Sequence, residues 1–325
     1  MSSDKPKADP QYSSSSQEDS YQEFLRDVLC GLSADQKSVP GKYLWDEEGS
    51  TIFDRACTSP DYYVARQETA LLRLAANEIA GLVGQDAVLV EFGSGASHKV
   101  RLLLDALRTC RRYIAVDISK DYLEAATARI AADYPDLDVV PVAGDYSRPL
   151  DLPLASEKGP VLGFFPGNAI GNFEASAVVA FLVRVREGMG PSRFLIGVDP
   201  NDERESLARA YGGGGSLLGA FHQNLLTRMV RELGAELTPE HFRHEPRVFD
   251  DPLHVEAHLV ARQASVIRIG QEEFSFASGD SIHTDNSFKY TPDAFRELAI
   301  QAGWTPVQCW IDDEKLSSLH LLQTG

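Results

Sequence analysis

Apolar and polar residues follow two alternating patterns between residues 88 and 199. Short apolar runs rich in β-branched side chains, the pattern of buried strands, occupy 88–92, 111–117, 137–143, 160–165 and 193–199. Longer stretches with apolar residues at helical spacing occupy 100–107, 121–132 and 175–189. Strands that alternate with helices in this way predict an α/β fold with a parallel, doubly wound sheet.

The segments on either side of this region show other patterns. Residues 1–20 are rich in Ser, Asp, Lys and Gln, which predicts a disordered tail, whereas 38–54 holds turn residues and aromatics with little periodicity. Further helices are expected at 21–32, 67–82, 203–211, 217–233 and 292–302. A period of two over 247–276 predicts two or three antiparallel strands in a second, smaller lobe. The apolar residues of 304–310 and 319–322 predict an antiparallel edge pair of the main sheet.

The 325-residue chain carries a formal net charge of −17 and four cysteines. The acidic excess disfavours nucleic acid and anionic membranes as partners, because the basic residues would have to cluster strongly to form a positive face. No apolar run approaches the length that spans a bilayer, and the N-terminus is polar rather than a signal peptide. The cysteines are scattered and form no Cys-x-x-Cys pair, so we expect reduced thiols and a cytoplasmic location.

A glycine turn follows the first strand of the alternating region. Gly93, Ser94 and Gly95 allow a tight turn and a close approach of a ligand to the backbone, and the next helix points its N-terminal amides at this turn. The second strand ends at Asp117, about twenty residues later, where dinucleotide folds place a carboxylate that binds ribose hydroxyls. Position 98 is His and not the third glycine of a pyrophosphate-binding fingerprint. An adenosine ligand without phosphates is therefore favoured, and S-adenosylmethionine (SAM) is the leading candidate.

Polar residues also follow the third and fourth strands, at the edge of the sheet where open α/β folds bind ligands. Asp145 follows the third strand and could accept a hydrogen bond from an adenine amino group. Asn168 and Asn172 lie in the loop after the fourth strand and would offer uncharged donors and acceptors beside a sulfonium. Taken singly, these residues fit ordinary caps and turns as well. The order of Asp117 and Asp145 after a glycine turn favours the ligand interpretation.

Two polar segments lie in the region of the second lobe. His254, Glu256 and His258 would share one face of a strand. A metal site is conceivable there, but alternating polar side chains on a half-solvated strand are commoner, so we expect no metal. The segment 283–290 is polar and aromatic and just precedes the return of the chain to the sheet. It could close over a cleft or serve as a solvated hinge.

Six motifs carry a resemblance that covers the chain from about residue 21 to 322; they lie at 60–63, 93–99, 166–172, 209–211, 220–225 and 283–290. They resemble the SAM-dependent histidine Nα-methyltransferases of ergothioneine biosynthesis. This resemblance implies a Rossmann-like class I methyltransferase domain (64–200 and 291–325) and a substrate-binding lobe (21–63 and 201–290). It also implies transfer of methyl groups from SAM to the α-amine of a free amino acid, a small-molecule partner, with S-adenosyl-L-homocysteine as the product and no metal.

The resemblance assigns roles to the matching residues. The cofactor would be held by Gly93, Ser94, Gly95, Lys99, Asp117, Asp145, Tyr146 and Asn168. The amino acid would be bound by Trp45, Tyr62, Asn172, Tyr211, Phe221, Ala257, Asp285 and Ser287. Of these, Asn172 and Tyr211 would grip the carboxylate and the amine with Tyr62 nearby, and these three are the expected catalytic residues. Asp285 and Ser287 would meet the substrate's side chain.

Four positions depart from the family pattern. Asp285 stands where Glu is usual, Ala257 where a bulkier Met is common, Trp45 where a Tyr is usual, and glycines 212–215 replace a polar turn. These changes suggest a wider or reshaped side-chain pocket. The acceptor is then either histidine, which would become its trimethylated betaine, or a different amino acid such as an aromatic one. A non-catalytic SAM-binding protein is the third interpretation, which the glycine run favours and the intact substrate residues disfavour.

Overall fold

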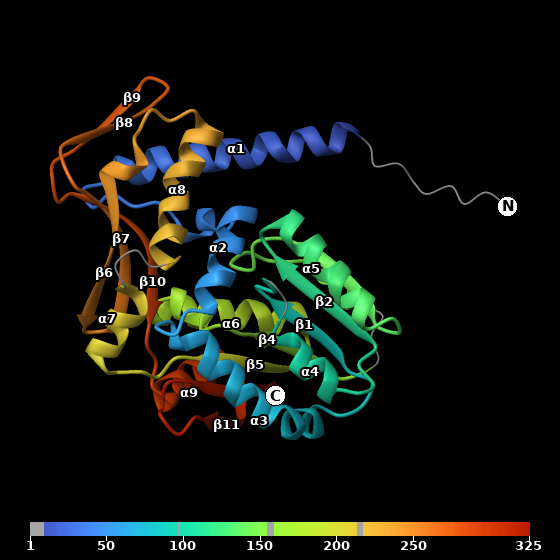
Figure 1. The fold of residues 1–325 in the computed structure, drawn as a ribbon. Helices are drawn as coiled ribbons and strands as arrows, with labels where there is room; N and C mark the ends of the chain where they lie inside the picture. The colour runs from blue at the N-terminus through green and yellow to red at the C-terminus, as the bar shows by residue number, and fades with distance from the viewer. Residues whose placement is uncertain (1–9, 96–97, 155–158, 213–216) are drawn as a thin grey trace.

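The computed structural model describes residues 10–95, 98–154, 159–212 and 217–325, and its larger part is a seven-stranded sheet (Figure 1). The strands are β1 (Val88–Phe92), β2 (Arg112–Asp117), β3 (Asp138–Ala143), β4 (Val161–Phe165), β5 (Arg193–Val198), β11 (Trp304–Ile311) and β12 (Ser318–Thr324). They lie in the order β11-β12-β5-β4-β1-β2-β3. Strands β1 to β5 pair in parallel, whereas β12 is antiparallel to β5 and β11 to β12. The predicted parallel sheet with an antiparallel edge pair is confirmed.

Helices cover both faces of this sheet. They are α3 (Tyr63–Val83), α4 (Val100–Ala106), α5 (Lys120–Asp133), α6 (Ala175–Met189) and α9 (Pro292–Gln301). Successive residues of a strand point to opposite faces. In β1, Leu89 therefore packs in the core under α3, α4 and α5, while Val90 packs in the core under α6 and α9. Both side chains are fully buried, so the sheet is the middle layer of three.

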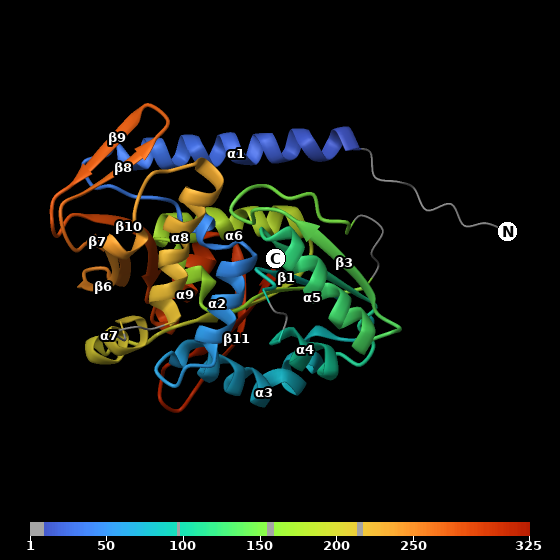
Figure 2. The same ribbon diagram turned by 45° about the horizontal axis from the view of Figure 1, so that its top comes forward.

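A second lobe is built around the antiparallel sheet β10-β7-β6. Its strands are β6 (Phe242–Asp250), β7 (Leu253–Ala261), β8 (Ser265–Ile269), β9 (Glu272–Phe276) and β10 (Ser281–Phe288). Its helices are α1 (Pro10–Leu32), η1 (Gly41–Leu44), α2 (Glu47–Cys57), α7 (Arg204–Gly212) and α8 (Leu217–Leu233). An apolar core joins α1 and α8 to these strands. Figures 1 and 2 show this lobe beside the large sheet, with α2 and α8 on the side that faces it.

Two helices differ from the sequence prediction. Helix α1 begins at Pro10, inside the expected disordered tail, of which residues 1–9 lie outside the described part of the chain. Proline fits the first turn of a helix, and residues 11–20 contain no Gly or Pro that would end it. Helix α2 lies where little periodicity was found. Its N-cap is Asp46, whose carboxylate accepts the Gly49 N–H at 2.8 Å, and its first turn carries Glu47 and Glu48, which favours a helix start.

The polar segment 283–290 is not a solvated hinge, because most of it belongs to strand β10. β10 pairs with β7, and the register shifts between His283 and Asp285. Such a bulge adds one residue, here Thr284, and re-aims the side chains that follow it.

The glycine run after α7 cannot be compared with its prediction beyond Gly212, because residues 213–216 lie outside the described ranges. Within those ranges, no helix combines the length and the apolar character needed to cross a membrane.

Candidate active site

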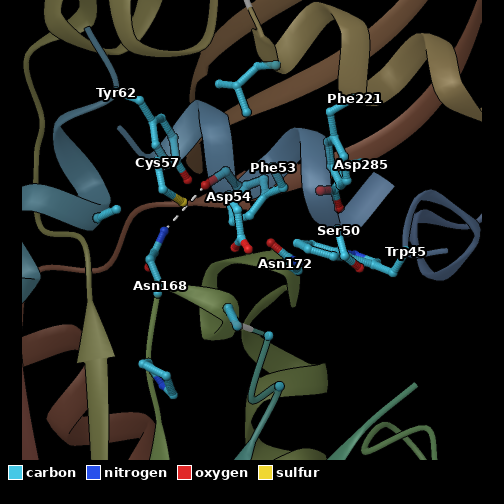
Figure 3. A pocket seen from close by; sticks show the side chains of 18 of the residues that line it. Trp45, Ser50, Phe53, Asp54, Cys57, Tyr62, Asn168, Asn172, Phe221 and Asp285 are labelled. Atoms are coloured by element: carbon cyan, nitrogen blue, oxygen red, sulfur yellow. Dashed lines mark hydrogen bonds between the residues drawn. The ribbon is translucent and has the colours of Figure 1, made fainter. Parts of the chain in front are cut away.

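A cavity of about 560 Å³ lies between the carboxyl ends of the sheet strands and the second lobe. Its size suits a small-molecule ligand. Fifteen of the predicted site residues line it: Trp45, Tyr62, Gly93, Ser94, Gly95, Lys99, Asp117, Tyr146, Asn168, Asn172, Tyr211, Phe221, Ala257, Asp285 and Ser287. Figure 3 shows Asp285, Phe221 and Trp45 along one side and Tyr62 with Asn168 along another. The two predicted groups therefore share one continuous space.

The glycine turn forms the sheet side of this cavity. Gly93 and Gly95 have φ values of 71° and 48°, a left-handed conformation that glycine adopts without strain. The Gly95 N–H donates to one carboxylate oxygen of Asp117 at 3.0 Å, and the Ser119 N–H donates to the other at 2.9 Å. The hydroxyl of Ser94 is buried and has no hydrogen-bond partner in the described part of the chain. An unpaired buried hydroxyl beside a fixed carboxylate suits a ligand that carries hydroxyl or amino groups.

Glu68 of α3 binds the loop after β4 and the side chain of Lys99, although the sequence did not point to it. Both of its carboxylate oxygens lie 2.8 Å from the Gly167 N–H, and one of them forms an ion pair with Lys99. The strand β5 passes so close that a Cβ atom on Gly197 would lie 1.7 Å from a Glu68 oxygen. Gly197 thus leaves the space that Glu68 needs to hold Lys99 at the cavity.

Asp145 is the predicted cofactor residue that does not line the cavity. One of its carboxylate oxygens accepts the Ser147 N–H at 2.8 Å, and the other lies 3.7 Å from Arg148 Nε. This carboxylate closes a local turn after β3. The neighbouring Tyr146 does line the cavity, and its ring would lie 3.5 Å from a Cβ on Gly93. The adenine role of Asp145 therefore stays a prediction without support from its position.

Aromatic rings form the wall on the side of the second lobe. Trp45 lies 4.9 Å, between ring centroids, from both Phe53 and Phe221. Tyr62 lies 6.0 Å from Phe53 and 5.9 Å from Tyr211. Edge contacts of this kind hold the rings in fixed orientations. Phe53 was not predicted, because α2 itself was not recognised in the sequence.

Asp285 faces the same part of the cavity from strand β10. It pairs directly with Ala257 of β7, and a Cβ on Gly41 would lie 3.0 Å from its carboxylate. The carboxylate accepts the Asn286 N–H at 2.9 Å. Burial raises the pKa of Asp285 to about 7, an effect that this hydrogen bond reduces. The group can therefore be protonated or ionised near neutral pH.

The asparagines expected beside the methyl donor lie in and before η2 (Ala169–Asn172). Asn168 has a left-handed backbone, with φ of 55°. Its side-chain oxygen accepts the Asp199 N–H at 3.0 Å, and its amide nitrogen donates to Ser287 Oγ at 3.3 Å. Asn172 ends η2, and Figure 3 shows it between Asn168 and Trp45 in the cavity. Asn168 therefore links this loop to Asp199 and to Ser287 of β10, whereas Asn172 lines the cavity.

Behind Tyr211 lies a buried cluster that the sequence analysis missed. Lys289 Nζ lies 2.7 Å from Asp199 Oδ2, 2.8 Å from Tyr211 Oη and 2.9 Å from Ser287 Oγ. The Tyr63 hydroxyl donates to the same Asp199 oxygen at 2.7 Å. Burial alone would lower the pKa of Lys289, but Asp199 and Tyr211 raise it above its usual value, so the ammonium stays charged. Only its spacing of two residues from Ser287 and four from Asp285 could have indicated that Lys289 lies on the same side of the chain.

His222 is another residue of the cavity wall that was not predicted. Its ring stacks on His244 with 4.7 Å between centroids. The Thr284 hydroxyl donates to the Ala257 carbonyl at 3.0 Å, so it accepts from His222 Nδ1, also at 3.0 Å. Burial lowers the pKa of His222 well below its usual value, and the ring is neutral. Its other nitrogen, Nε2, is then a hydrogen-bond acceptor.

Two further contacts join helices of the second lobe to the sheet domain. Tyr122 of α5 donates to the carboxylate of Asp54 in α2, and both residues line the cavity. Further out, Arg148 forms an ion pair with Glu23 of α1. Burial raises the pKa of Asp54, an effect that the hydrogen bond from Tyr122 reduces. The second lobe is thus anchored to the sheet domain beside the predicted cofactor site.

The alternating residues of β7 do share one face, as their spacing predicted. Glu256 lies 3.4 Å from His254 Nε2 and 2.7 Å from His258 Nε2. Among the residues that the structure describes, no group of three or more His, Cys, Asp or Glu is arranged to hold a metal ion.

Comparison with known proteins adds a further observation. A family model described as "Histidine-specific methyltransferase, SAM-dependent" matches residues 24–324. The chain is 35% identical over 302 residues to a histidine N-alpha-methyltransferase of Mycolicibacterium smegmatis, covering 90% of this chain and 93% of that protein. It is 32% identical over 295 residues to one of Mycobacterium tuberculosis, with coverages of 89% and 91%. A 4-dimethylallyltryptophan N-methyltransferase of Claviceps purpurea is 24% identical over 314 residues, with coverages of 88% and 90%.

Proposed function

Because this chain belongs to the family of SAM-dependent, histidine-specific methyltransferases, we propose that it methylates the α-amine of free histidine to the trimethylated betaine of the ergothioneine route. The chain is an enzyme, as the sequence predicted, and not a non-catalytic SAM-binding protein. The observation that carries the proposal is the single cavity that joins the glycine turn to Asn172 and Tyr211. A methyl donor and an amine held in one such space are positioned to react.

The residues of the glycine turn fit SAM. The buried, unpaired hydroxyl of Ser94 offers a donor and an acceptor, and Asp117 keeps acceptor capacity for ribose hydroxyls beyond the two backbone N–H groups that it binds. Lys99, held by Glu68, would lie near the carboxylate of the methionine part, and Tyr146 beside the adenosine part. When bound, SAM supplies a methyl group on a positively charged sulfur. Asn168 would present its amide near this group without bringing a competing nucleophile.

The residues that bind the amino acid would keep its α-amine neutral and aligned with the methyl group. A free α-amine carries a proton at neutral pH unless its surroundings favour the neutral form. Burial raises the pKa of Tyr62 well above its usual range, so this phenol is a hydrogen-bonding group and not a base. Burial of the amine in the cavity disfavours an ammonium that lacks a paired anion. Much of the catalysis would then come from alignment of the amine with the methyl group.

The cavity wall opposite the amine site supports a second class of amino acid as the methyl acceptor. Ala257 lies across from Asp285, and the neighbouring rings of Trp45 and Phe221 would pack on a flat side chain. An aromatic amino acid whose ring carries a donor, such as tryptophan or tyrosine, would fit this arrangement, with Asp285 as the acceptor. The reaction at the α-amine would be the same.

A mass-spectrometric screen of the purified enzyme with SAM and the twenty amino acids tests the proposal. Gain of three methyl groups on histidine is the expected result, and methylation of tryptophan or tyrosine instead would establish the second acceptor class. A parallel purification from host cells that carry the empty vector controls for methyltransferases of the expression host. Absence of any methylated amino acid would refute both acceptor classes.

The four cysteines are free, so a reducing, cytoplasmic location is part of the same proposal.

A further inference from the structure

Lys289 directly follows β10 and lies behind Tyr211, which lines the cavity where the amino acid would bind. We infer that Lys289 is a positioning residue that fixes the direction of every hydrogen bond around Tyr211, so that the Tyr211 hydroxyl can only donate into the cavity, to the carboxylate of the substrate. This inference rests on the proposed function, because it concerns how the same amino acid is held.

An ammonium group has three N–H donors and no acceptor. The three donors of Lys289 are all used, by Asp199 Oδ2 at 2.7 Å, Tyr211 Oη at 2.8 Å and Ser287 Oγ at 2.9 Å. Asp199 is held in turn by the Tyr63 hydroxyl at 2.7 Å and the Asn201 N–H at 3.0 Å. Lys289 and Asp199 therefore form a neutral, fixed pair, and the lysine cannot bind the substrate itself.

Ser287 is the next group in the cluster. Asn168 donates to its oxygen at 3.3 Å, and this direction is fixed because the other end of the same amide accepts the Asp199 N–H. Lys289 donates to the Ser287 oxygen as well. Both lone pairs of the hydroxyl are then filled, so Ser287 has to donate its own hydrogen. Its remaining neighbour in the cluster is Tyr211 Oη, 2.8 Å away. Ser287, expected to meet the substrate's side chain, is thus committed to Tyr211.

Tyr211 receives hydrogen bonds from both Lys289 and Ser287. With both acceptor positions occupied, its own hydrogen is directed elsewhere, and its side chain lines the cavity. Tyr211 is therefore a donor only. An amine about to be methylated has to keep its lone pair free, so a donor aimed at the amine would block the reaction. A carboxylate accepts hydrogen bonds and has no such constraint, so Tyr211 binds the carboxylate and not the amine.

Binding measurements on substituted enzymes test this inference. The Kd values of histidine and of histamine, the same amine without the carboxylate, are measured by calorimetry for Lys289→Met, Tyr211→Phe and the double variant. We expect Lys289→Met to raise the Kd of histidine about 10- to 100-fold, the usual effect of losing a hydrogen bond to a charged group. The Kd values of histamine and of SAM should stay within about twofold, and the double variant should bind histidine no more weakly than Tyr211→Phe alone.

Removal of Lys289 leaves a buried carboxylate unpaired, which can impair folding. The Lys289→Met/Asp199→Asn variant avoids that charge and should show the same loss of histidine affinity. Lys42→Met is the matched control. Lys42 forms an ion pair with Asp27, which also accepts a hydrogen bond from the Tyr43 hydroxyl, and this pair does not line the cavity. Wild-type histidine affinity in both Lys289 variants would overturn the inference. Equal losses for histidine and histamine, or effects that add to those of Tyr211→Phe, would also overturn it.

The failure of the proposed function would be seen separately. If the wild-type enzyme binds and methylates a different amino acid, the same comparison is made with that amino acid and its decarboxylated amine, and the role of Lys289 is tested unchanged. If the wild-type enzyme binds no amino acid, the proposed function fails, and with it the carboxylate assigned to Tyr211.

Discussion

Asp285 and Ala257 are direct partners across the antiparallel pair of β10 and β7. Facing residues of such a pair lie about 5 Å apart and share one local environment. A carboxyl group and a methyl-sized side chain therefore form the same part of the cavity wall. Their combined size and polarity decide which amino-acid side chain can lie between them and the rings of Trp45 and Phe221.

Enlarging both partners should favour the smaller acceptor. In the double variant Asp285→Glu/Ala257→Met, we expect the ratio of kcat/KM for histidine to that for tryptophan to rise at least about 10- to 200-fold, the range that a single methylene group produces in an apolar pocket. Competition between the two amino acids, followed by mass spectrometry, measures this ratio directly. Each single variant should show part of the effect. A ratio that stays at its wild-type value would mean that this pair does not decide the acceptor.

The stability of the protein should depend on the ionisation of Asp285. An aspartate in an unfolded chain has a pKa near 3.9, whereas burial raises the pKa of Asp285 to about 7. Between about pH 4 and pH 7 the folded state holds a proton that the unfolded state has lost, so the free energy of unfolding falls as the pH rises through this window. Above the window the loss is complete and constant.

Asp285→Asn removes this dependence. The free energy of unfolding of the variant minus that of the wild type should rise by about 1–3 kcal/mol between pH 5 and pH 8. This range follows from about 1.4 kcal/mol per pKa unit, reduced because Asp285 is partly exposed. Urea unfolding at the two pH values measures it. Asp313→Asn, an exposed aspartate before β12, serves as the control and should show no such change. An equal pH response in the Asp285 variant and the wild type would contradict a raised pKa.

The sequence predicted most of the residues on the sheet side of the cavity and fewer of those on the side of the second lobe. Gly93, Gly95 and Asp117 follow strands whose apolar runs are plain in the sequence, and the carboxyl ends of parallel strands meet at one edge. Lys289 could not be placed in the same way. Its partners Asp199 and Tyr211 are 90 and 78 residues away, and only the tertiary fold brings them together.

Helix α2 shows a second limit. Gly49, Ser50 and Thr51 are poor helix formers, and they hid a helix whose start was marked by Asp46. Tertiary packing of α2 against α8 outweighs these local preferences. Because α2 was missed, Phe53 and Asp54 were absent from the predicted site, although both line the cavity.

Asn172 should contribute directly to substrate binding. Replacement by Ala removes the amide that η2 presents to the cavity, and we expect a loss of about 1.5–3 kcal/mol in the binding free energy of the amino acid, the usual worth of a hydrogen bond to a charged group. The affinity for SAM should change much less. Calorimetric titration of each ligand separates the two effects. Asn77→Ala, on the exposed side of α3, is the control. Unchanged amino-acid affinity would remove Asn172 from the substrate site.

Gly197 should be intolerant of even one added methyl group. A Cβ at this position would lie 1.7 Å from Glu68, which holds both Lys99 and the Gly167 N–H. We expect Gly197→Ala to lower the free energy of unfolding by about 1–3 kcal/mol, as overpacking does, and to weaken SAM binding as well. Thermal unfolding with and without SAM measures both.

Gly188→Ala provides the matched comparison, because a Cβ at Gly188 in α6 would meet nothing within 4 Å. That variant should be as stable as the wild type or more stable by about 0.5–1 kcal/mol, since alanine is the better helix former. If Gly197→Ala behaves like Gly188→Ala, then Glu68 can move without disturbing the site.

The division of the cavity wall has a consequence for how such enzymes diversify. On the proposed function, the methyl-donor side would be carried by the turns after β1 and β2, and the side that faces the acceptor by α2, α8, β7 and β10. Substitutions in the second set would then change which amino acid is bound without disturbing the binding of the methyl donor. The product of a duplicated gene could thus change its amino-acid substrate through a few mutations. Each intermediate would remain an active methyltransferase, so no inactive ancestor would be needed on the way.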